Sequence, residues 1–251
     1  MNELVFITDL DRTIIHSKNK GFLCVEKNEQ KEITYMTQYS YDKLQHLLSK
    51  KEFKFVPCTM RNITQTLRVG FIREYNPKII ICTNGAQIYI DGKLDEEWDR
   101  IVKSKVDLNE VENEIDYIKN LNIQCEEIRN IEGFYITVKF QDTQSAKIGY
   151  EIIRAKYNAY RKVLLIGVKV FVIHEIIDKI NAVDYIIDKF SMKNIVTAGD
   201  TDVDSEFTKR GISILPKHSS FKHDKSIITS KNGILATDEI VDYLNNILKQ
   251  E

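Results

Sequence analysis

The sequence lacks an excess of charge of either sign. Its 251 residues include 36 Lys plus Arg and 37 Asp plus Glu, which leaves a formal net charge of −1. Proteins that bind nucleic acid normally carry a basic excess that neutralises phosphates, so we expect no nucleic-acid partner. Apolar residues make up 43% of the chain, too many for a disordered protein. The composition is that of a soluble globular protein with one large domain or two modest ones.

Cysteine is scarce and forms no recognisable pattern. The four cysteines, Cys24, Cys58, Cys82 and Cys125, stand far apart and include no CxxC pair. We therefore expect neither a disulfide framework nor a zinc site, and a reducing compartment is the default.

Long hydrophobic runs are also missing. The longest, Val163 to Ile173, contains Gly167 and Lys169 and is far shorter than the roughly 20 residues that span a bilayer. The first ten residues have no cationic lead, and Asp9 interrupts their apolar stretch, so they do not resemble a signal peptide. We expect a cytoplasmic protein without a membrane partner.

What the chain does contain is a series of short apolar runs rich in β-branched residues. The runs do not alternate with polar residues, which is typical of strands buried on both faces of a parallel sheet. Helical patterns lie between several of them, and this alternation predicts a doubly wound α/β fold. The predicted strands are residues 4–10, 54–59, 78–83, 194–200 and 212–216.

Four helices are predicted in this α/β part from apolar residues at steps of three and four. Ser40 is the predicted N-cap of the first helix, and Thr237 precedes the fourth. The four apolar stripes are Leu44, Leu47 and Leu48; Ile63, Leu67 and Phe71; Ile180, Val183 and Ile187; and Ile240, Leu244 and Ile247.

Two segments interrupt the alternation of strands and helices. Residues 17–39 read as a β-hairpin flap directly after the first strand, and residues 86–172 form a larger insertion. We therefore predict a core of residues 1–85 and 173–251 that carries an inserted α+β domain of residues 86–172.

The insertion has its own internal pattern of strands and helices. It opens with an Asp91-Gly92 turn, a strong hairpin signal, and continues with antiparallel strands and two helices. Asp107 is the predicted cap of the first helix. The second helix is predicted over residues 143–162, with an apolar face of Ile148, Ile152, Ala155 and Ala159.

Polar residues gather where the predicted core strands end. The carboxyl ends of parallel strands lie at one edge of a sheet, where ligands bind in such folds. Carboxylates crowded at that edge repel one another unless a hard cation such as Mg²⁺ neutralises them. The pattern therefore favours a metal-assisted phosphoryl site. The residues concerned are Asp9, Asp11, Thr59, Arg61, Asn84, Asp200 and Asp204.

The same residues resemble the four motifs of the haloacid dehalogenase (HAD) superfamily. DLDRT, from Asp9, resembles the DxDxT of motif I, and Thr59 resembles motif II. Lys179, which opens the helix after the insertion, resembles motif III, and GDTDVD, which ends at Asp204, resembles the GDxxxD of motif IV. The motifs occur in the right order and extend over the whole chain.

Two further stretches refine this resemblance. TNGAQIYIDGK, from Thr83, resembles the entry into the type II cap of Cof-like and sucrose-phosphatase-like members. Together with DLDRTII and the CVE hairpin, it also resembles HAD hydrolases encoded in bacterial tellurite and stress-resistance clusters. The resemblance thus implies a HAD-like core with a type II cap placed above Asp9.

The resemblance also implies an activity, that of a Mg²⁺-dependent phosphatase acting on a small phosphorylated metabolite such as a sugar phosphate. Asp9 would be the nucleophile that forms an aspartyl-phosphate, and Asp11 the general acid and base. Thr59 and Lys179 would bind the phosphoryl oxygens. The implied Mg²⁺ ligands are Asp9, the Asp11 carbonyl, Asp200 and, directly or through water, Asp204.

The sequence departs from the family pattern beside these residues. Arg12 and Met60 stand where Gly is usual, and Val203 stands where Asn is common. These departures lie beside the residues with implied catalytic roles and leave those roles unaffected. They do weaken any inference about the substrate. Arg12, Arg61 and Asn84 are candidates for substrate contact, although Asn84 fits a turn residue equally well.

Other interpretations fit less well or stay open. GDTDVDSE resembles the start of an EF-hand, but Ser205 and Gly211 stand where that loop needs Gly and Glu. A response-regulator receiver does not carry an insertion of this size. A phosphomutase or phosphotransferase on the same site and a non-catalytic phosphate- or partner-binding protein remain as alternatives. The metabolite and the oligomeric state are left open.

Overall fold

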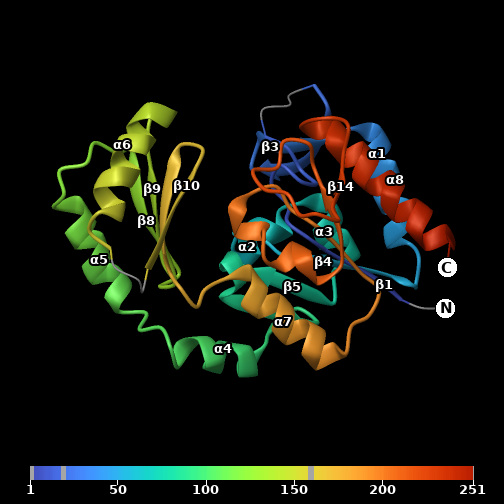
Figure 1. Cartoon of the computed structure of the whole chain (residues 1–251), viewed down its shortest axis with the longest axis horizontal. Coiled ribbons are helices and arrows are strands. Elements are labelled where there is room, and N and C mark those ends of the chain that lie inside the picture. Colours follow the sequence, from blue (N-terminus) through green and yellow to red (C-terminus); the bar gives the residue numbers. More distant parts are fainter. Residues whose placement is uncertain (1–2, 18–20, 158–160, 251) are drawn as a thin grey trace. The chain divides into compact units, whose positions relative to one another are not determined.

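The computed structural model describes residues 3–17, 21–157 and 161–250 (Figure 1). The chain divides into two compact units. Unit 1 consists of Met1–Asp95 and Lys179–Glu251, and unit 2 consists of Glu96–Asp178. Unit 2 is therefore an insertion within unit 1.

A parallel sheet forms the centre of unit 1. Its strand order is β14-β13-β12-β1-β4, and all neighbouring strands are parallel. All five residues of β1 are buried, as expected for a central strand covered on both faces. The strands are β1 (Leu4–Thr8), β4 (Phe53–Pro57), β12 (Ile195–Ala198), β13 (Ile212–Leu215) and β14 (Ile227–Ile228).

Helices cover this sheet, as the alternating pattern predicts. Phe6 of β1 packs in one apolar cluster with Leu44 of α1 (Gln38–Leu48) and Ile240 of α8 (Ile234–Gln250). Figure 1 shows α1 and α8 side by side. α7 (Lys179–Phe190) packs against β5 (Ile79–Cys82) and buries Ala182 and Val183. The predicted doubly wound α/β fold of the core is present.

The ends of three helices differ from the sequence prediction. The N-cap of α1 is Thr37, whose side chain accepts a hydrogen bond from the Ser40 amide, so Ser40 lies inside the helix. Thr237 lies inside α8 instead of preceding it, and its buried hydroxyl donates to the Thr13 carbonyl at 2.9 Å. The stripe from Ile63 is divided between two short helices, α2 (Ile63–Leu67) and α3 (Gly70–Tyr75).

Two hairpins complete unit 1. β2 (Leu23–Asn28) and β3 (Lys31–Met36) pair antiparallel, which confirms the hairpin predicted in residues 17–39 as far as the chain is described; residues 18–20 lie outside that part. β6 (Gln87–Ile90) and β7 (Lys93–Leu94) extend β5 as an antiparallel sheet. The Asp91-Gly92 turn between them has positive φ at both residues, as a two-residue hairpin turn requires.

The boundaries of the two units therefore differ from the predicted 86–172 insertion. Residues 86–95 belong to unit 1 because β6 pairs with β5 and β7 pairs with β6, whereas residues 173–178 belong to unit 2. The hairpin signal at Asp91-Gly92 identified the right local structure, but not the sheet that it extends.

Unit 2 is an antiparallel sheet with helices packed on it. The strand order is β10-β11-β9-β8, and α5 (Glu110–Lys119) and α6 (Thr143–Arg154) share an apolar core with β9 and β11. The predicted α+β character is present. The strands are β8 (Glu127–Ile131), β9 (Tyr135–Lys139), β10 (Arg161–Ile166) and β11 (Lys169–His174).

The predicted apolar face of α6 is wrong. Ile148 is 55% exposed and Ile152 is 37% exposed, whereas Gly149 and Ile153 are buried. Gly149 packs directly against the ring of Phe140, so closely that a Cβ there would lie 2.1 Å from Cζ of Phe140. A hydropathy pattern gives glycine no weight, so the helix is turned relative to the prediction. Ala159 lies outside the described residues.

A further helix of unit 2 was not predicted. α4 (Glu96–Lys103) follows β7 directly and buries Trp98, the only tryptophan of the chain, together with Val102. The predicted start of the first helix of the insertion, at Asp107, is close to the observed start of α5, whose cap is Asn109.

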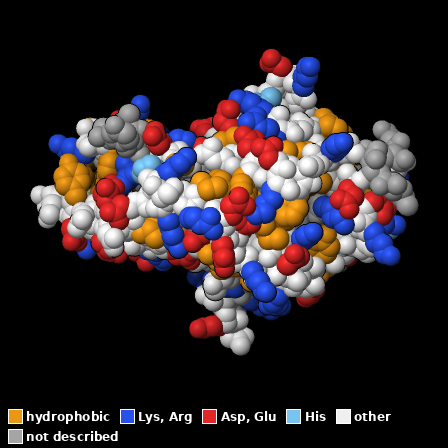
Figure 2. Space-filling model, turned by 90° about the horizontal axis from the view of Figure 1, so that it is seen from below, with side chains coloured by type: hydrophobic (Ala, Val, Ile, Leu, Met, Phe, Trp, Pro, Cys, Tyr) orange, Lys and Arg blue, Asp and Glu red, His pale blue; other side chains and the backbone are white. Residues whose placement is uncertain are grey.

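Charge and hydropathy on the structure agree with the composition. On the face drawn in Figure 2, acidic and basic side chains are interspersed, in keeping with the net charge of −1. Among the described residues, no helix combines the length and apolar character that a membrane crossing requires. The four cysteines, Cys24, Cys58, Cys82 and Cys125, all lie in the described part of the chain and form no disulfide there.

Candidate active site

The carboxyl ends of β1, β4 and β12 lie next to one another because β1 pairs with the other two strands in parallel. The chain leaves β1 at Asp9, whose amide donates to the Ala198 carbonyl of β12 at 2.9 Å. Thr59 follows β4, and its amide donates to Ile81 of β5 at 2.9 Å. The edge predicted from the sequence therefore exists in unit 1.

Three buried carboxylates meet at this edge. Asp9, Asp200 and Asp204 each have an oxygen within 4.8 Å of the others. Lys179, the first residue of α7, is fully buried between two of them. Its Nζ lies 2.6 Å from Oδ1 of Asp9 and 2.7 Å from Oδ1 of Asp204. Residues from three distant segments of the sequence thus form one cluster of charges.

Burial governs the protonation of this cluster. Burial raises the pKa of Asp9 well above its ordinary value; Lys179 opposes this shift, and the neighbouring carboxylates add to it. Burial likewise raises the pKa of Asp200, to about 7. Burial alone would lower the pKa of Lys179, but the charges of Asp204 and Asp9 outweigh it and raise that pKa. Lys179 therefore stays protonated, whereas Asp9 and Asp200 ionise less readily than exposed carboxyl groups do.

Asp200 offers an oxygen that suits a bound cation. Its Oδ2 is buried and has no hydrogen-bond partner within the part of the chain that the structure describes. Arg12 Nε lies 3.1 Å away as an ion pair, without the alignment of a hydrogen bond. A buried, unsatisfied carboxylate oxygen is costly, and Mg²⁺ prefers such oxygen ligands. The residues at this edge therefore fit Mg²⁺.

Asp204 is bound differently from Asp200. Its Oδ2 accepts hydrogen bonds from the amides of Asp200 and Thr201 and from the Thr201 hydroxyl, all at 3.0 Å. Its Oδ1 accepts from Lys179. Gly199 makes room for it, because a Cβ there would lie 2.4 Å from Cβ of Asp204. Asp204 thus fixes the loop that presents Asp200 and holds Lys179 in place.

Asp11 is bound to Arg61 instead of pointing into the carboxylate cluster. Arg61 donates from Nε to Oδ2 of Asp11 at 2.6 Å and from Nη2 to Oδ1 at 2.7 Å. Its Nη1 donates to Glu26 at 2.9 Å. Arg61, a candidate for substrate contact, is therefore occupied by two carboxylates of the protein.

The remaining predicted residues lie close to Thr59. The Thr59 hydroxyl accepts from the Arg61 amide at 3.1 Å, which leaves its own hydrogen to donate. The Asn84 amide donates to the Thr59 carbonyl at 3.0 Å, and both Thr83 and Asn84 have positive φ. A left-handed conformation is unusual for a β-branched residue such as Thr83, and such strain often marks a functional site. Asn84 is both a turn residue and a buried neighbour of the site.

Glu26 and Arg68 were missed by sequence reasoning. Glu26 lies in β2, outside the four motifs, and its side chain is fully buried between Arg61 and Arg68. The available signal was weak: a charged residue next to the apolar Val25 within a predicted hairpin strand.

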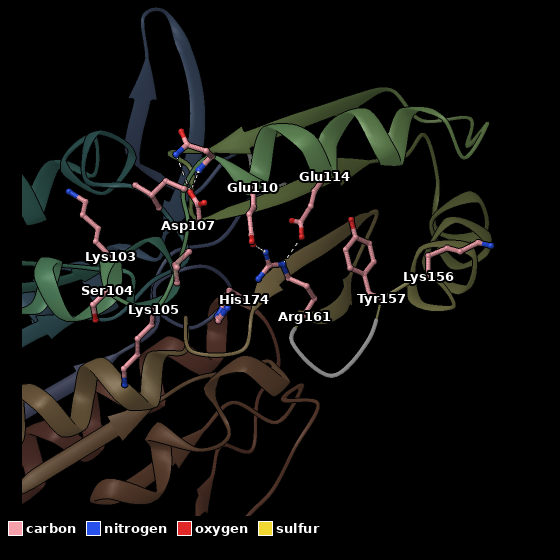
Figure 3. A pocket seen from close by; sticks show the side chains of 13 residues that line it. Lys103, Ser104, Lys105, Asp107, Glu110, Glu114, Lys156, Tyr157, Arg161 and His174 are labelled. Carbon is pink, nitrogen blue, oxygen red and sulfur yellow. Dashed lines mark hydrogen bonds and ion pairs between the residues drawn. The ribbon is translucent and has the colours of Figure 1, made fainter.

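Unit 2 contains a separate cavity of about 1040 Å³ (Figure 3). Arg161 lines it and donates to Glu114 at 2.7 Å and to Glu110 at 2.9 Å, and Figure 3 shows both acids pointing to the guanidinium. Among the described residues, the carboxylates close enough together to hold a metal ion are Asp9, Asp200 and Asp204, and none of them lines this cavity.

Comparisons with known proteins agree with the motifs and the fold. Residues 2–217 match the model of the family described as sucrose-6F-phosphate phosphohydrolase. No curated protein sequence matches the chain.

Solved structures share the fold at low sequence identity. The sucrose-phosphatase of Synechocystis sp. PCC6803, in complex with sucrose and phosphate, is 13% identical with a TM-score of 0.67, over 98% of this chain and 99% of that one. The C-terminal domain of C. albicans trehalose-6-phosphate phosphatase is 13% identical with a TM-score of 0.67, over 98% and 93%. A HAD subclass IIB sugar phosphatase is 15% identical with a TM-score of 0.64, over 97% and 98%. The predicted HAD fold is confirmed.

Proposed function

Since the chain belongs to the sucrose-6F-phosphate phosphohydrolase family, we propose that it hydrolyses a small sugar phosphate with the help of Mg²⁺. The chain is a HAD hydrolase with a type II cap, and its family consists of phosphatases. The observation that carries the proposal is the buried cluster of Asp9, Lys179 and Asp200 at the carboxyl edge of the sheet.

In this proposal Asp9 is the nucleophile. One of its carboxylate oxygens attacks phosphorus in line, and the bond from phosphorus to the sugar oxygen breaks. Asp11 gives a proton to that oxygen as the sugar leaves. In the second step water attacks the phosphorus of the aspartyl-phosphate and gives a proton to Asp11, the bond from phosphorus to the Asp9 oxygen breaks, and inorganic phosphate departs. Asp9 and Asp11 are then as they were at the start.

Lys179 and Thr59 are proposed to hold the phosphoryl group. An ammonium group has three N–H donors, and two of them bind Asp9 and Asp204. We assign the third donor of Lys179 and the hydroxyl of Thr59 to phosphoryl oxygens, where charge must be stabilised.

Asp9, the Asp11 carbonyl and Asp200 are the proposed Mg²⁺ ligands, with Asp204 acting through the loop and through water. When bound, Mg²⁺ neutralises the carboxylates and draws electron density from the phosphoryl group. The unsatisfied Oδ2 of Asp200 supports this assignment.

The class of substrate is inferred from the family and from the fold neighbours. The family description names a sucrose phosphate, and one neighbour is a trehalose-6-phosphate phosphatase. We propose a mono- or disaccharide phosphate, with unit 2 supplying the groups that recognise the sugar.

The test is release of inorganic phosphate from a panel that contains sucrose 6F-phosphate, trehalose 6-phosphate, hexose phosphates and an aryl phosphate. Turnover is expected with Mg²⁺ and not with EDTA, and Asp9→Asn should abolish it because an amide is no nucleophile. Asp202→Asn is the matched control, since Asp202 lies on the same loop but is exposed and binds Ser220.

Two results would contradict the proposal. Full activity in EDTA or in Asp9→Asn would exclude this mechanism. A phosphorylated product without inorganic phosphate, seen by phosphorus NMR, would instead identify a mutase or a phosphotransferase.

A further inference from the structure

Glu26 is a buried carboxylate that none of the four motifs contains. It lies in β2, and its side chain is fully buried. The pairing of β2 with β3 is irregular on both sides of it, between Cys24 and Glu26 and between Glu26 and Lys27. Side chains of a regular strand alternate between its faces, yet Val25 and Glu26 are both buried. A β-bulge thus turns Glu26 inward, as bulges beside active sites commonly do.

The inward carboxylate is bound by two arginines. Oε2 accepts from Nη1 of Arg61 at 2.9 Å and from the Thr34 hydroxyl at 3.0 Å. Oε1 accepts from Nε of Arg68 at 3.1 Å. A buried carboxylate is costly unless it is paired and hydrogen-bonded, and here both oxygens are satisfied.

The bond to Arg61 fixes the direction of a second bond. A guanidinium is planar, so an acceptor that holds Nη1 sets where Nε and Nη2 point. These two atoms bind both oxygens of Asp11, at 2.6 and 2.7 Å. The Asp11 side chain is 49% exposed, whereas that of Arg61 is only 11% exposed. The rotamer of Asp11 is therefore set by the buried Arg61, and that of Arg61 by Glu26 together with the Gln65 carbonyl, which accepts from the same Nη1 at 3.4 Å.

We propose that Glu26 is a positioning residue: through Arg61 it orients the Asp11 carboxylate for proton transfer to the leaving group. The hairpin of β2 and β3 then contributes a positioning residue to the active site. This inference rests on the proposed function for its chemical meaning, while the positioning itself can be tested without turnover.

Leaving-group dependence separates positioning from a general loss of structure. An alkoxide needs a proton as it departs, whereas 2,4-dinitrophenolate leaves without one. Complete loss of general acid catalysis costs roughly 10²–10⁴-fold, so a misdirected Asp11 should cost about 10- to 100-fold. For Glu26→Gln we expect that loss in kcat/KM for an alkyl or sugar phosphate, and less than about threefold for 2,4-dinitrophenyl phosphate. kcat/KM is the quantity to compare because it includes only the steps up to the transfer of the phosphoryl group to Asp9, in which the leaving group departs.

Matched variants complete the design. Glu32→Gln, on β3 of the same hairpin, removes an exposed carboxylate that binds only Tyr35 in the described contacts, and parent rates are expected. Glu26→Asp keeps the charge and should recover most of the kcat/KM for the alkyl or sugar phosphate. It is also the variant to measure if Glu26→Gln does not fold. An equal loss for both leaving groups, or no loss in a folded Glu26→Gln, would overturn the proposal.

A crystal structure of Glu26→Gln gives a readout that needs no activity. Arg61 is expected to turn and to release at least one oxygen of Asp11, because the amide has one acceptor oxygen where the carboxylate has two, and its NH2 group faces an arginine as a second donor. Persistence of both bonds would overturn the positioning role. If the parent protein turns over neither substrate, the proposed function fails, and this structure still decides the positioning.

Discussion

Removal of the buried cation Lys179 should destabilise unit 1 strongly, and more so as pH rises. Lys179→Met keeps the length of the side chain and removes its charge. Asp9 and Asp204, both bound to Lys179 and both buried, then lose their common partner. Breaking a buried ion pair by removing one member costs about 3–5 kcal/mol, because a buried charge is left uncompensated.

The pH dependence follows from the pKa of Asp9. Burial already raises this pKa, and Lys179 is the influence that opposes the shift, so the variant carboxyl takes up a proton at higher pH. A raised folded-state pKa of an acid costs stability above the unfolded-state pKa, and the cost grows until the folded-state pKa is passed. The variant is therefore expected to lose about 4 kcal/mol at pH 8 and clearly less at pH 5.5.

Urea unfolding in EDTA measures this loss. With a slope of about 2 kcal/mol/M, a loss of about 4 kcal/mol lowers the midpoint by about 2 M. Far-UV circular dichroism is the appropriate signal, since the only tryptophan, Trp98, lies in unit 2. Lys209→Met is the control, because its pair with Glu206 is exposed and should contribute less than about 0.5 kcal/mol. A midpoint shift below about 0.5 M at pH 8, or one equal at both pH values, would refute the reasoning.

Three further predictions concern the packing of Gly199, the pH dependence of Mg²⁺ binding and the role of unit 2. Gly199→Ala should displace Asp204 and cost about 1–3 kcal/mol by overpacking, whereas Gly70→Ala, where a Cβ meets nothing closer than 3.5 Å, should be nearly neutral in the same urea assay. Mg²⁺ should raise the melting temperature more at pH 8 than at pH 6, because protons compete for Asp200, whose pKa is raised to about 7; an equal gain would argue against Asp200 as a ligand. Replacing residues 96–178 with a short Gly/Ser linker should leave aryl phosphatase activity without discrimination among sugar phosphates, and a core that keeps the parent ranking would place selectivity in unit 1.

The sequence predicted four of the five strands of the parallel sheet, because that information is local and redundant. Residues 78–83 were assigned to the same sheet, but β5 pairs antiparallel with β6 and meets the end of β4 at the parallel bridge of Cys58 and Ile81. Each central strand is a short run of apolar residues, and the polar residue that ends the run must lie at the carboxyl edge. Asp9, Thr59 and Asp200 could therefore be placed from strand ends alone. Lys179 could not: a lysine that opens a helix is normally solvated, and only the family motif singled it out.

Helix phase and helix caps were predicted less well, for reasons visible in single residues. The inward face of α6 is centred on Gly149, which packs against Phe140 and carries no hydropathy signal. Ser40 and Thr37 are both good caps by residue type, and the choice between them depends on which hydroxyl meets the free amides. Such choices are made by tertiary packing, which a local pattern does not contain.

A motif records which side chains reach the edge of the sheet, but not what each one binds there. GDTDVD presents Asp200 and Asp204 as two equivalent carboxylates. In the folded chain Asp204 accepts four hydrogen bonds, from Lys179 and from its own loop. Asp200 keeps a buried oxygen that accepts no hydrogen bond from any residue that the structure describes. The division follows from chain geometry: the short turn after Gly199 points Asp204 back at the loop amides, so its charge is used to hold the loop. Asp200 is thereby left as the carboxylate that a cation must satisfy, and its substitution should weaken Mg²⁺ binding more directly than that of Asp204.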